Sequence, residues 1–388
     1  MSRFVNSRLF FIVFMAVLIV SLTGLSLDSV RWRTFGVNDS YVTIYQIGLF
    51  LFGITVSFVN KDRYKDSSTS IINLFCFLCL LASLINGVDS DYRSLMAMLF
   101  NILVIPIGLA SGKYIMENIE EKSYKDIWFL LLQIPSLFVG ITLLGVNFKF
   151  DSDCAFAFFL YMPLVFFISK NPIKIPLLVF YGVLILLAGK RSIFVAYVMC
   201  MGIYFLHSVF EKNDRTSSKN AQRLLLVIVL LGSAFWLYYN NIEQFDYIGG
   251  RFSNIRDDGG SGRDELYASI LGAFESSDLI SQLFGHGYSS VLKTFQVGAH
   301  NDLLEILYDY GFLAVFTYVI FLIKLVLYTF HLRRYHAERI AGISYILIIN
   351  ISIIIILGLL NCMVASTIFN FTNFIALGAT LKLIQIKQ

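Results

Sequence analysis

The chain contains 388 residues, of which 57% are hydrophobic and only 14% are charged. Soluble globular domains contain about one quarter charged residues, so this composition excludes a water-soluble globular protein. The net charge of +4 comes without a long basic run, which argues against nucleic acid as a partner. The five cysteines show no disulfide framework, metal spacing or redox motif, because Cys76 and Cys79 lie inside one apolar segment.

Apolar runs long enough to form membrane helices follow one another along most of the chain. A spanning helix needs about 20 mostly apolar residues, so we predict an all-α, polytopic membrane protein of about 12 transmembrane helices. The first run is interpreted as an uncleaved span rather than a signal peptide. Pro106, Pro135 and Pro163 fall inside runs, where kinks are tolerated. The runs cover residues 9–26, 41–59, 71–86, 94–111, 127–146, 154–169, 173–189, 192–210, 222–240, 302–323, 341–360 and 363–381.

Lysine and arginine are concentrated in alternate connecting segments. One such segment contains Lys61, Arg63 and Lys65, and a later one contains Arg333 and Arg334. Positively charged connections remain in the cytoplasm, so we predict that both termini are cytoplasmic.

The predicted spans are divided by one long polar connection, residues 241–300. The same orientation places this loop on the outer side of the membrane. We therefore predict three regions: helices 1–9 in residues 1–240, the large outer loop, and helices 10–12 in residues 301–388. A structureless loop of this length would be unusual unless it were functional, so we expect the chemistry here.

The second half of this loop is predicted to be helical. A glycine-rich stretch, DDGGSGRDE at residues 257–265, is followed by Leu266, Ile270 and Phe274, which recur at the spacing of a short amphipathic helix. The glycines of the later GHG sequence are expected to end the helical segment and reverse the chain.

Arginines on the outer side are candidates for binding phosphate, because the planar guanidinium pairs with two phosphate oxygens at once. Arg191 lies beside Lys190 in a tight connection between two predicted spans, against the positive-inside bias. The alternative is a charge pair that merely bounds two helices. Arg263 begins the predicted amphipathic helix, where the acids that follow it suit the helix dipole but an arginine does not. Arg251 is a weaker candidate of the same kind.

His300 begins the tenth predicted span and is a candidate general base. The positive end of the helix dipole disfavours imidazolium and keeps the ring able to accept a proton. The alternative is a histidine that anchors the helix at the membrane interface. The other outward histidine, His286, lies in the GHG turn. Acidic pairs at residues 89/91 and 151/153 are interpreted as polar turns, so neither a metal nor a cofactor is predicted.

Four segments occur in the order seen in the O-antigen polymerase and O-antigen ligase superfamily, and the chain resembles that superfamily over about a third of its length. The departures from the superfamily pattern are Tyr267, where tryptophan is frequent, and Lys190, where serine or threonine commonly precedes the arginine. The segments are LLAGKRSIF (186–194), SGRDELY (261–267), FGHGYSS (284–290) and AHNDLLEILYDYGFLA (299–314).

The resemblance implies a membrane glycosyltransferase of the C-type fold, metal-independent and inverting, at the outer face of the bacterial inner membrane. It implies that Arg191 and Arg263 bind the diphosphate of an undecaprenyl-diphosphate-linked glycan and that His300 accepts a proton from, or orients, the attacking hydroxyl. Fixed cations suit the charge that develops on a leaving diphosphate. Further candidate substrate-binding residues are Lys190, Arg251, Tyr267, His286, Asn301 and Glu305.

The leading functional hypothesis is an O-antigen or capsule repeat-unit polymerase, which joins the glycan of one lipid carrier to the repeat unit of another. The alternatives are a ligase that transfers glycan to lipid A core, a lipid-linked glycan flippase or transporter, and an inactive scaffold subunit. The expected partners are the lipid-linked donor and acceptor, membrane lipid and, as a further candidate, a chain-length regulator. A transporter usually places ionisable residues near the bilayer midplane, and the predicted spans contain few.

Overall fold

The computed structural model consists of α-helices, and the residues that it describes contain no strand. This confirms the predicted all-α class. The described residues are 7–35, 41–59, 66–86, 92–119, 122–145, 154–188, 190–210, 262–335, 337–361 and 366–387.

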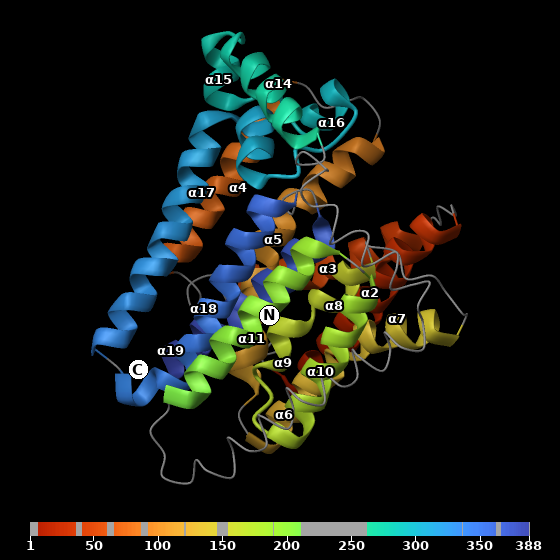
Figure 1. Cartoon of the computed structure of the whole chain (residues 1–388), viewed down its shortest axis with the longest axis vertical. Helices are drawn as coiled ribbons and strands as arrows, with labels where there is room; N and C mark the ends of the chain where they lie inside the picture. The colour runs from red at the N-terminus through yellow and green to blue at the C-terminus, as the bar shows by residue number, and fades with distance from the viewer. Residues whose placement is uncertain are drawn as a thin grey trace. The chain divides into compact units, whose positions relative to one another are not determined.

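The helices form two compact units, each described here by itself. The first unit contains Met1–Leu25, Ser40–Glu120 and Gly262–Gln388, and the second contains Ser26–Asp39 and Glu121–Ser261. The helices of the first unit (Figure 1) are the first part of α2 (Arg8–Phe35), α3 (Tyr41–Val59), α4 (Ser67–Ile85), α5 (Tyr92–Asn118), α14 (Arg263–Glu275), α15 (Leu279–Phe284), α16 (Ser290–Phe295), α17 (Asp302–Tyr335), α18 (Ala337–Leu360) and α19 (Thr367–Lys387). The second unit contains the last part of α2 and α6 (Lys122–Leu131), α7 (Ile134–Gly145), α8 (Cys154–Phe159), α9 (Met162–Val165), α10 (Asn171–Ala188) and α11 (Arg191–Phe210).

Four helical segments are long and apolar enough to cross a membrane: Ser67–Ile85, Ser94–Asn118, Asp302–Arg334 and Ile343–Leu360. Shorter apolar helices cover Arg8–Gly24, Ile47–Val59, Asn171–Leu186 and Arg191–His207. The predicted total of about 12 spans and the outer position of the large loop stay predictions. The predicted run at residues 222–240 lies outside the described residues.

Two of the predicted runs form pairs of short helices. Residues 127–146 divide mainly between α6 and α7, and residues 154–169 contain α8 and α9. Each second helix has a proline in its first turn, Pro135 in α7 and Pro163 in α9. Proline lacks the N–H that continues a helix but suits a helix start, which explains both breaks. Pro106, in contrast, remains inside α5.

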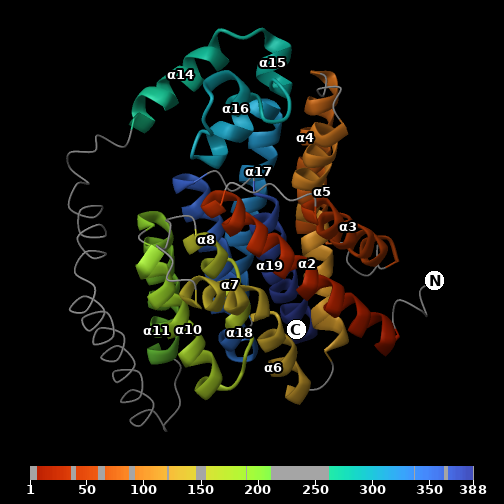
Figure 2. The same ribbon diagram turned by 90° about the vertical axis from the view of Figure 1, so that its right-hand side faces the viewer.

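In the first unit, α5 and α19 lie side by side (Figures 1 and 2), in contact through glycines. A Cβ atom added to Gly112 of α5 would overlap the carbonyl oxygen of Ile375, and one added to Gly378 of α19 would overlap that of Leu109. Gly108, one turn before Gly112, also faces α19, where a Cβ would lie 2.8 Å from the Phe371 carbonyl oxygen. Small residues four apart let two helices approach closely, and α5 contributes such a pair in Gly108 and Gly112.

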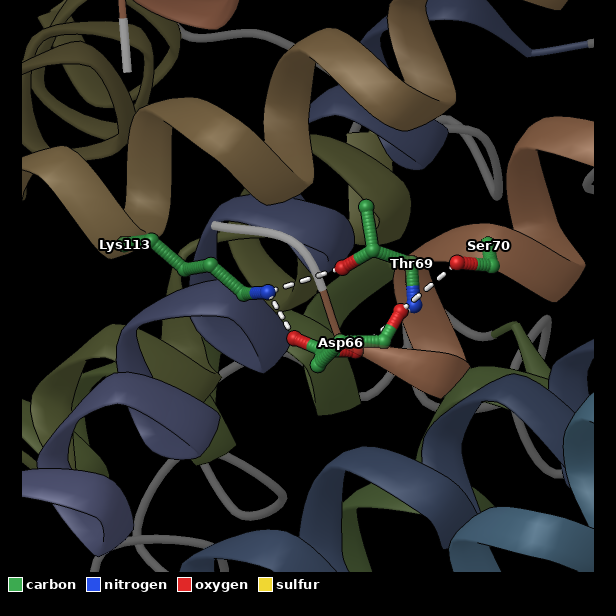
Figure 3. Close-up of polar contacts among 4 residues, drawn as sticks. All are labelled: Asp66, Thr69, Ser70 and Lys113. Atoms are coloured by element: carbon green, nitrogen blue, oxygen red, sulfur yellow. Dashed lines mark hydrogen bonds and ion pairs between the residues drawn. The ribbon is translucent and has the colours of Figure 1, made fainter. Parts of the chain in front are cut away.

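An ion pair between a buried lysine and a partly exposed aspartate joins α5 to the start of α4 (Figure 3). The Lys113 ammonium donates hydrogen bonds to the Asp66 carboxylate and to the Thr69 hydroxyl, the latter at 2.8 Å. Asp66 is also the N-cap of α4, where its other carboxylate oxygen accepts the Thr69 amide at 2.7 Å. Only 1% of the Lys113 side chain is exposed, and a buried charge needs a partner. Asp66, which is fixed at the start of α4, is that partner.

The second unit contains hydrogen bonds between buried side chains. The Tyr181 hydroxyl of α10 donates to Gln133 Oε1 at 2.9 Å, and Ser26 and Tyr161 share a hydrogen bond of 2.7 Å. Unpaired polar groups would be costly in an apolar interior, so these contacts fix which faces of the helices meet.

Candidate active site

A group of three short helices, called the cap, is gathered at the end of α17 that begins at Asp302 (Figures 1 and 2). The cap consists of α14, α15 and α16, and all three contact α17. A small apolar core between the cap and α17 contains Ile270, Val291, Ala299 and Tyr308. The second half of the predicted loop is thus a packed helical structure, built on the first turns of α17.

The helix α17 has a non-helical residue, Gly311, with φ 79° and ψ 178°. Its departure from helical geometry leaves the preceding carbonyls available to partners outside the helix. The Tyr308 carbonyl accepts the His286 amide at 2.9 Å, and the Asp309 carbonyl accepts the Gly287 amide at 2.8 Å. The kink therefore joins α17 to the GHG turn of the cap through backbone hydrogen bonds.

Glycine is required on both sides of this junction. A Cβ on Gly285 would overlap the Asp309 carbonyl, and a Cβ on Gly311 would overlap the Gly285 amide nitrogen and the Leu283 carbonyl. Both glycines also have positive φ angles, which other residues adopt at a cost. Gly285 of the GHG turn and Gly311 at the end of the HNDLLEILYDYG stretch therefore depend on each other, because each leaves room for the backbone of the other segment.

The Asp309 carboxylate fixes the segment that follows the turn. It accepts the Ser289 amide at 3.0 Å and the Val291 amide at 2.8 Å, and only 3% of the residue is exposed. Amide donors satisfy the carboxylate where water is excluded. Sequence reasoning missed Asp309. The available signal was its position two residues before Gly311 in the quoted stretch.

His286 is held on both of its ring nitrogens. Nδ1 lies 3.1 Å from the Tyr308 carbonyl oxygen and Nε2 lies 2.9 Å from the Ser277 hydroxyl. A carbonyl oxygen can only accept, so Nδ1 carries a proton. The ring also stacks on Tyr308, with centroids 4.3 Å apart and an interplanar angle of 15°. These contacts make His286 part of the junction between the cap and α17.

His300 occupies a left-handed backbone conformation, with φ 53°, two residues before the start of α17. On one side, Asn301 Oδ1 accepts the Leu303 amide at 2.9 Å and so caps the helix. On the other side, the buried Glu305 carboxylate accepts the Ala299 amide at 2.7 Å. The predicted helix start at His300 and Asn301 agrees with the structure, and the residues that flank His300 are tied to the first turn.

Arg263 and Tyr267 occupy the first two turns of α14. They are four residues apart and therefore share one face of the helix. The Tyr267 hydroxyl lies 3.5 Å from the His300 carbonyl oxygen, at the long end of hydrogen-bond distances. Tyr267 thus reaches the backbone of the segment that holds His300, and Arg263 lies one helical turn before Tyr267 in α14.

Two of the remaining predicted residues, Lys190 and Arg191, belong to the second unit. Arg191 is the first residue of α11 in the second unit, and both it and Lys190 are partly exposed. The Lys190 ammonium lies 5.2 Å from the centroid of the Phe156 ring, a cation–π distance. Arg251 lies outside the described residues. Within the described ranges, no group of three or more His, Cys, Asp or Glu side chains could hold a metal ion.

The apolar spans and the helical cap define a multi-pass helical membrane protein with a polar site at the end of one span. Residues 176–319 match the model of the family described as Wzy_C, O-antigen ligase. That match contains all four motif segments and confirms the predicted resemblance to the O-antigen polymerase and ligase superfamily, whose members are glycosyltransferase-like membrane enzymes. No curated protein matches the chain significantly.

Proposed function

We propose that the protein is a repeat-unit polymerase for O-antigen or capsule, which transfers a glycan from undecaprenyl diphosphate to a second lipid-linked repeat unit. The observation that carries the proposal is that Tyr267, one turn after Arg263 in α14, lies against the His300 carbonyl near the start of α17, inside the matched segment. In this proposal the cap faces the periplasm, both termini are cytoplasmic, and the bilayer is the bacterial inner membrane.

The start of α14 has the properties of an anion-binding site. Its N-cap is Gly262, which has a left-handed conformation and no side-chain hydrogen bond to the first turn. A cation at the positive end of a helix costs about 0.3–1 kcal/mol, so Arg263 opposes the stability of its own helix. First-turn amides and a guanidinium are both donors that phosphate oxygens accept. These features support binding of the donor diphosphate by Arg263.

His300 is proposed to act on the acceptor. The acceptor hydroxyl oxygen forms the new bond to the anomeric carbon while the bond from that carbon to the diphosphate breaks. The hydroxyl proton passes to the His300 imidazole, and undecaprenyl diphosphate leaves. Attack opposite the leaving group inverts the anomeric centre. A well-placed general base contributes on the order of 10² to 10⁴ in rate.

The other predicted residues take two kinds of role in this proposal. Arg191 supplies a second cation for the diphosphate, with Lys190 and Arg251 as further contributors of positive charge. Tyr267 and Asn301 border the acceptor position beside His300. Glu305 and His286 support that position through their bonds to Ala299 and to Tyr308. No step in this scheme uses a metal or a cofactor.

The second candidate is the ligase reaction, in which the acceptor is lipid A core. It is favoured by the description of the matching family, O-antigen ligase. Both reactions use the same donor and the same leaving group, so Arg263 and His300 keep their proposed roles.

The surface glycolipid ladder of cells with the gene deleted and then complemented tests the proposal. A polymerase predicts that deletion leaves lipid A core capped with a single repeat unit and that complementation restores the ladder. Bare core with long glycan accumulating on undecaprenyl diphosphate would replace the polymerase by the ligase. An unchanged ladder would contradict both reactions.

A further inference from the structure

The turn that joins the cap to α17 is also bonded to two other helices of the first unit. Asn86, which ends α4, donates from Nδ2 to the Gly285 carbonyl at 2.9 Å and to the Ala82 carbonyl of its own helix at 2.8 Å. Asn101 of α5 donates from Nδ2 to the Tyr288 hydroxyl at 2.5 Å. Residues 285–288 are therefore attached to α4 and α5 as well as to α17.

The bond between Asn101 and Tyr288 is partly buried. Burial raises the pKa of the Tyr288 hydroxyl, so the group is protonated and uncharged at neutral pH. An amide and a phenol removed from water each lose free energy unless they find a partner. The Asn101 amide donates to the Tyr288 hydroxyl, and this hydrogen bond fixes the position of Tyr288 along the axis of α5.

The contacts continue from Tyr288 towards His300. The next residue, Ser289, donates its amide to the Asp309 carboxylate, and Val291 donates to the same group. Val291 packs with Ala299 in the small core of the cap, and the Ala299 amide is held by Glu305. A shift of Tyr288 along the axis of α5 would therefore also move Ala299, the residue before His300.

We infer that Asn101 and Tyr288 are a positioning pair, which sets the place of His300 relative to the membrane helices for the reaction. The inference rests on the proposed function, because it concerns the geometry of that same site. The pair does not touch the substrate. It acts through the turn and α17, since a displacement of about 1 Å in a catalytic group can reduce a rate by about 100-fold.

The kinetic test uses Asn101→Leu, Tyr288→Phe and the double variant in a glycan-transfer assay with purified protein and lipid-linked repeat units. We expect each single variant to lower kcat by about tenfold or more and to change KM by less than about twofold. The double variant should be no worse than the more impaired single variant, because both changes remove one interaction. Losses that multiply, or that fall mainly on KM, would overturn the pairing.

A matched control is available on the same helix. Asn118 of α5 donates from Nδ2 to the Tyr114 carbonyl of its own helix at 2.9 Å and contacts no part of the cap through that bond. Asn118→Leu introduces the same change of residue and is expected to leave kcat within about twofold of the parent.

Hydrogen exchange separates this inference from the proposed function. In Asn101→Leu, the amides of Ser289 and Val291 are expected to exchange faster than in the parent, whereas Asn118→Leu leaves them unchanged. This result would support the pair as a structural connection even if no glycan transfer were found. Unchanged exchange in Asn101→Leu and in Tyr288→Phe would overturn the inference whatever the activity of the protein.

Discussion

Two parts of the first unit use glycine for close contact, with different consequences. Between α5 and α19, Gly112 and Gly378 bring two helix surfaces together, and both glycines stay within helices. At the junction of the cap, Gly285 and Gly311 have positive φ angles, and adjoining amides and carbonyls form hydrogen bonds between segments. The first contact holds two helices together, whereas the second supports the segment that contains His300. The role of a glycine thus follows from its φ angle and its neighbours.

The largest effect is expected for Gly311→Ala. The new methyl group would be strained at φ 79° and would overlap the Gly285 amide nitrogen, so the cap cannot keep its hydrogen bonds to α17. We expect glycan transfer to fall by about 100-fold or more at normal abundance in the membrane. Activity per inserted molecule, quantified on membranes from the same cultures, checks this.

The matched control is Gly272→Ala in α14. Gly272 is helical, and a Cβ there would meet nothing within 4 Å. Alanine should preserve activity and stabilise α14 by up to about 1 kcal/mol. Parental activity in Gly311→Ala would contradict the account of the junction.

The next largest effect is expected on thermal stability, at the contact between α5 and α19. In Gly112→Leu the side chain would enter the space of the Ile375 carbonyl, so α5 and α19 must separate. Overpacking at a backbone contact should cost about 3 kcal/mol or more, seen as a lower thermal midpoint in detergent. Gly202→Leu in α11, where a Cβ meets nothing within 4 Å, should leave the midpoint near the parental value. Equal midpoints for the two variants would show that the α5–α19 contact is not tight.

A smaller effect is expected for Asp309→Asn. The amide group has one acceptor oxygen and places N–H donors towards the amides that the carboxylate held, so one of the two hydrogen bonds is lost. We expect a loss of about 1–3 kcal/mol in the free energy of opening, measured by hydrogen exchange at Ser289 and Val291. The exposed Glu275→Gln is the control. Slower or equal exchange in Asp309→Asn would contradict the role assigned to this carboxylate.

Most of the helical segments could be predicted from the sequence, because apolar length and helix-end residues are local signals. The run at 41–59 coincides with α3, and the starts at Arg263 and beside Asn301 match α14 and α17. The interruptions at Pro135 and Pro163 were expected as kinks and are complete breaks. A proline inside an apolar run permits either outcome, as Pro106 shows by remaining inside α5.

The candidate site could be predicted only in part. Arg263 and His300 had visible sequence signals, and the structure brings their segments together through Tyr267. For Asp309 and Gly311, which support them, the only signal was their place in the segment at residues 299–314, because both resemble ordinary helical residues until their partners in the cap are known. Asn101 gave no signal, since its partner Tyr288 is distant in the sequence.

The central claim is that Arg263 and His300 carry glycan transfer from undecaprenyl diphosphate, with Arg191 as the second cation. The most direct measurement follows purified protein in liposomes with undecaprenyl-diphosphate-linked repeat units, and quantifies both the elongated glycan and the undecaprenyl diphosphate released. We predict that the parent releases one undecaprenyl diphosphate for each glycosidic linkage formed. Arg191→Ala, Arg263→Ala and His300→Ala should form neither, although each inserts normally. Parental elongation by any two of these variants, or movement of the glycolipid across the bilayer without elongation, would contradict the claim.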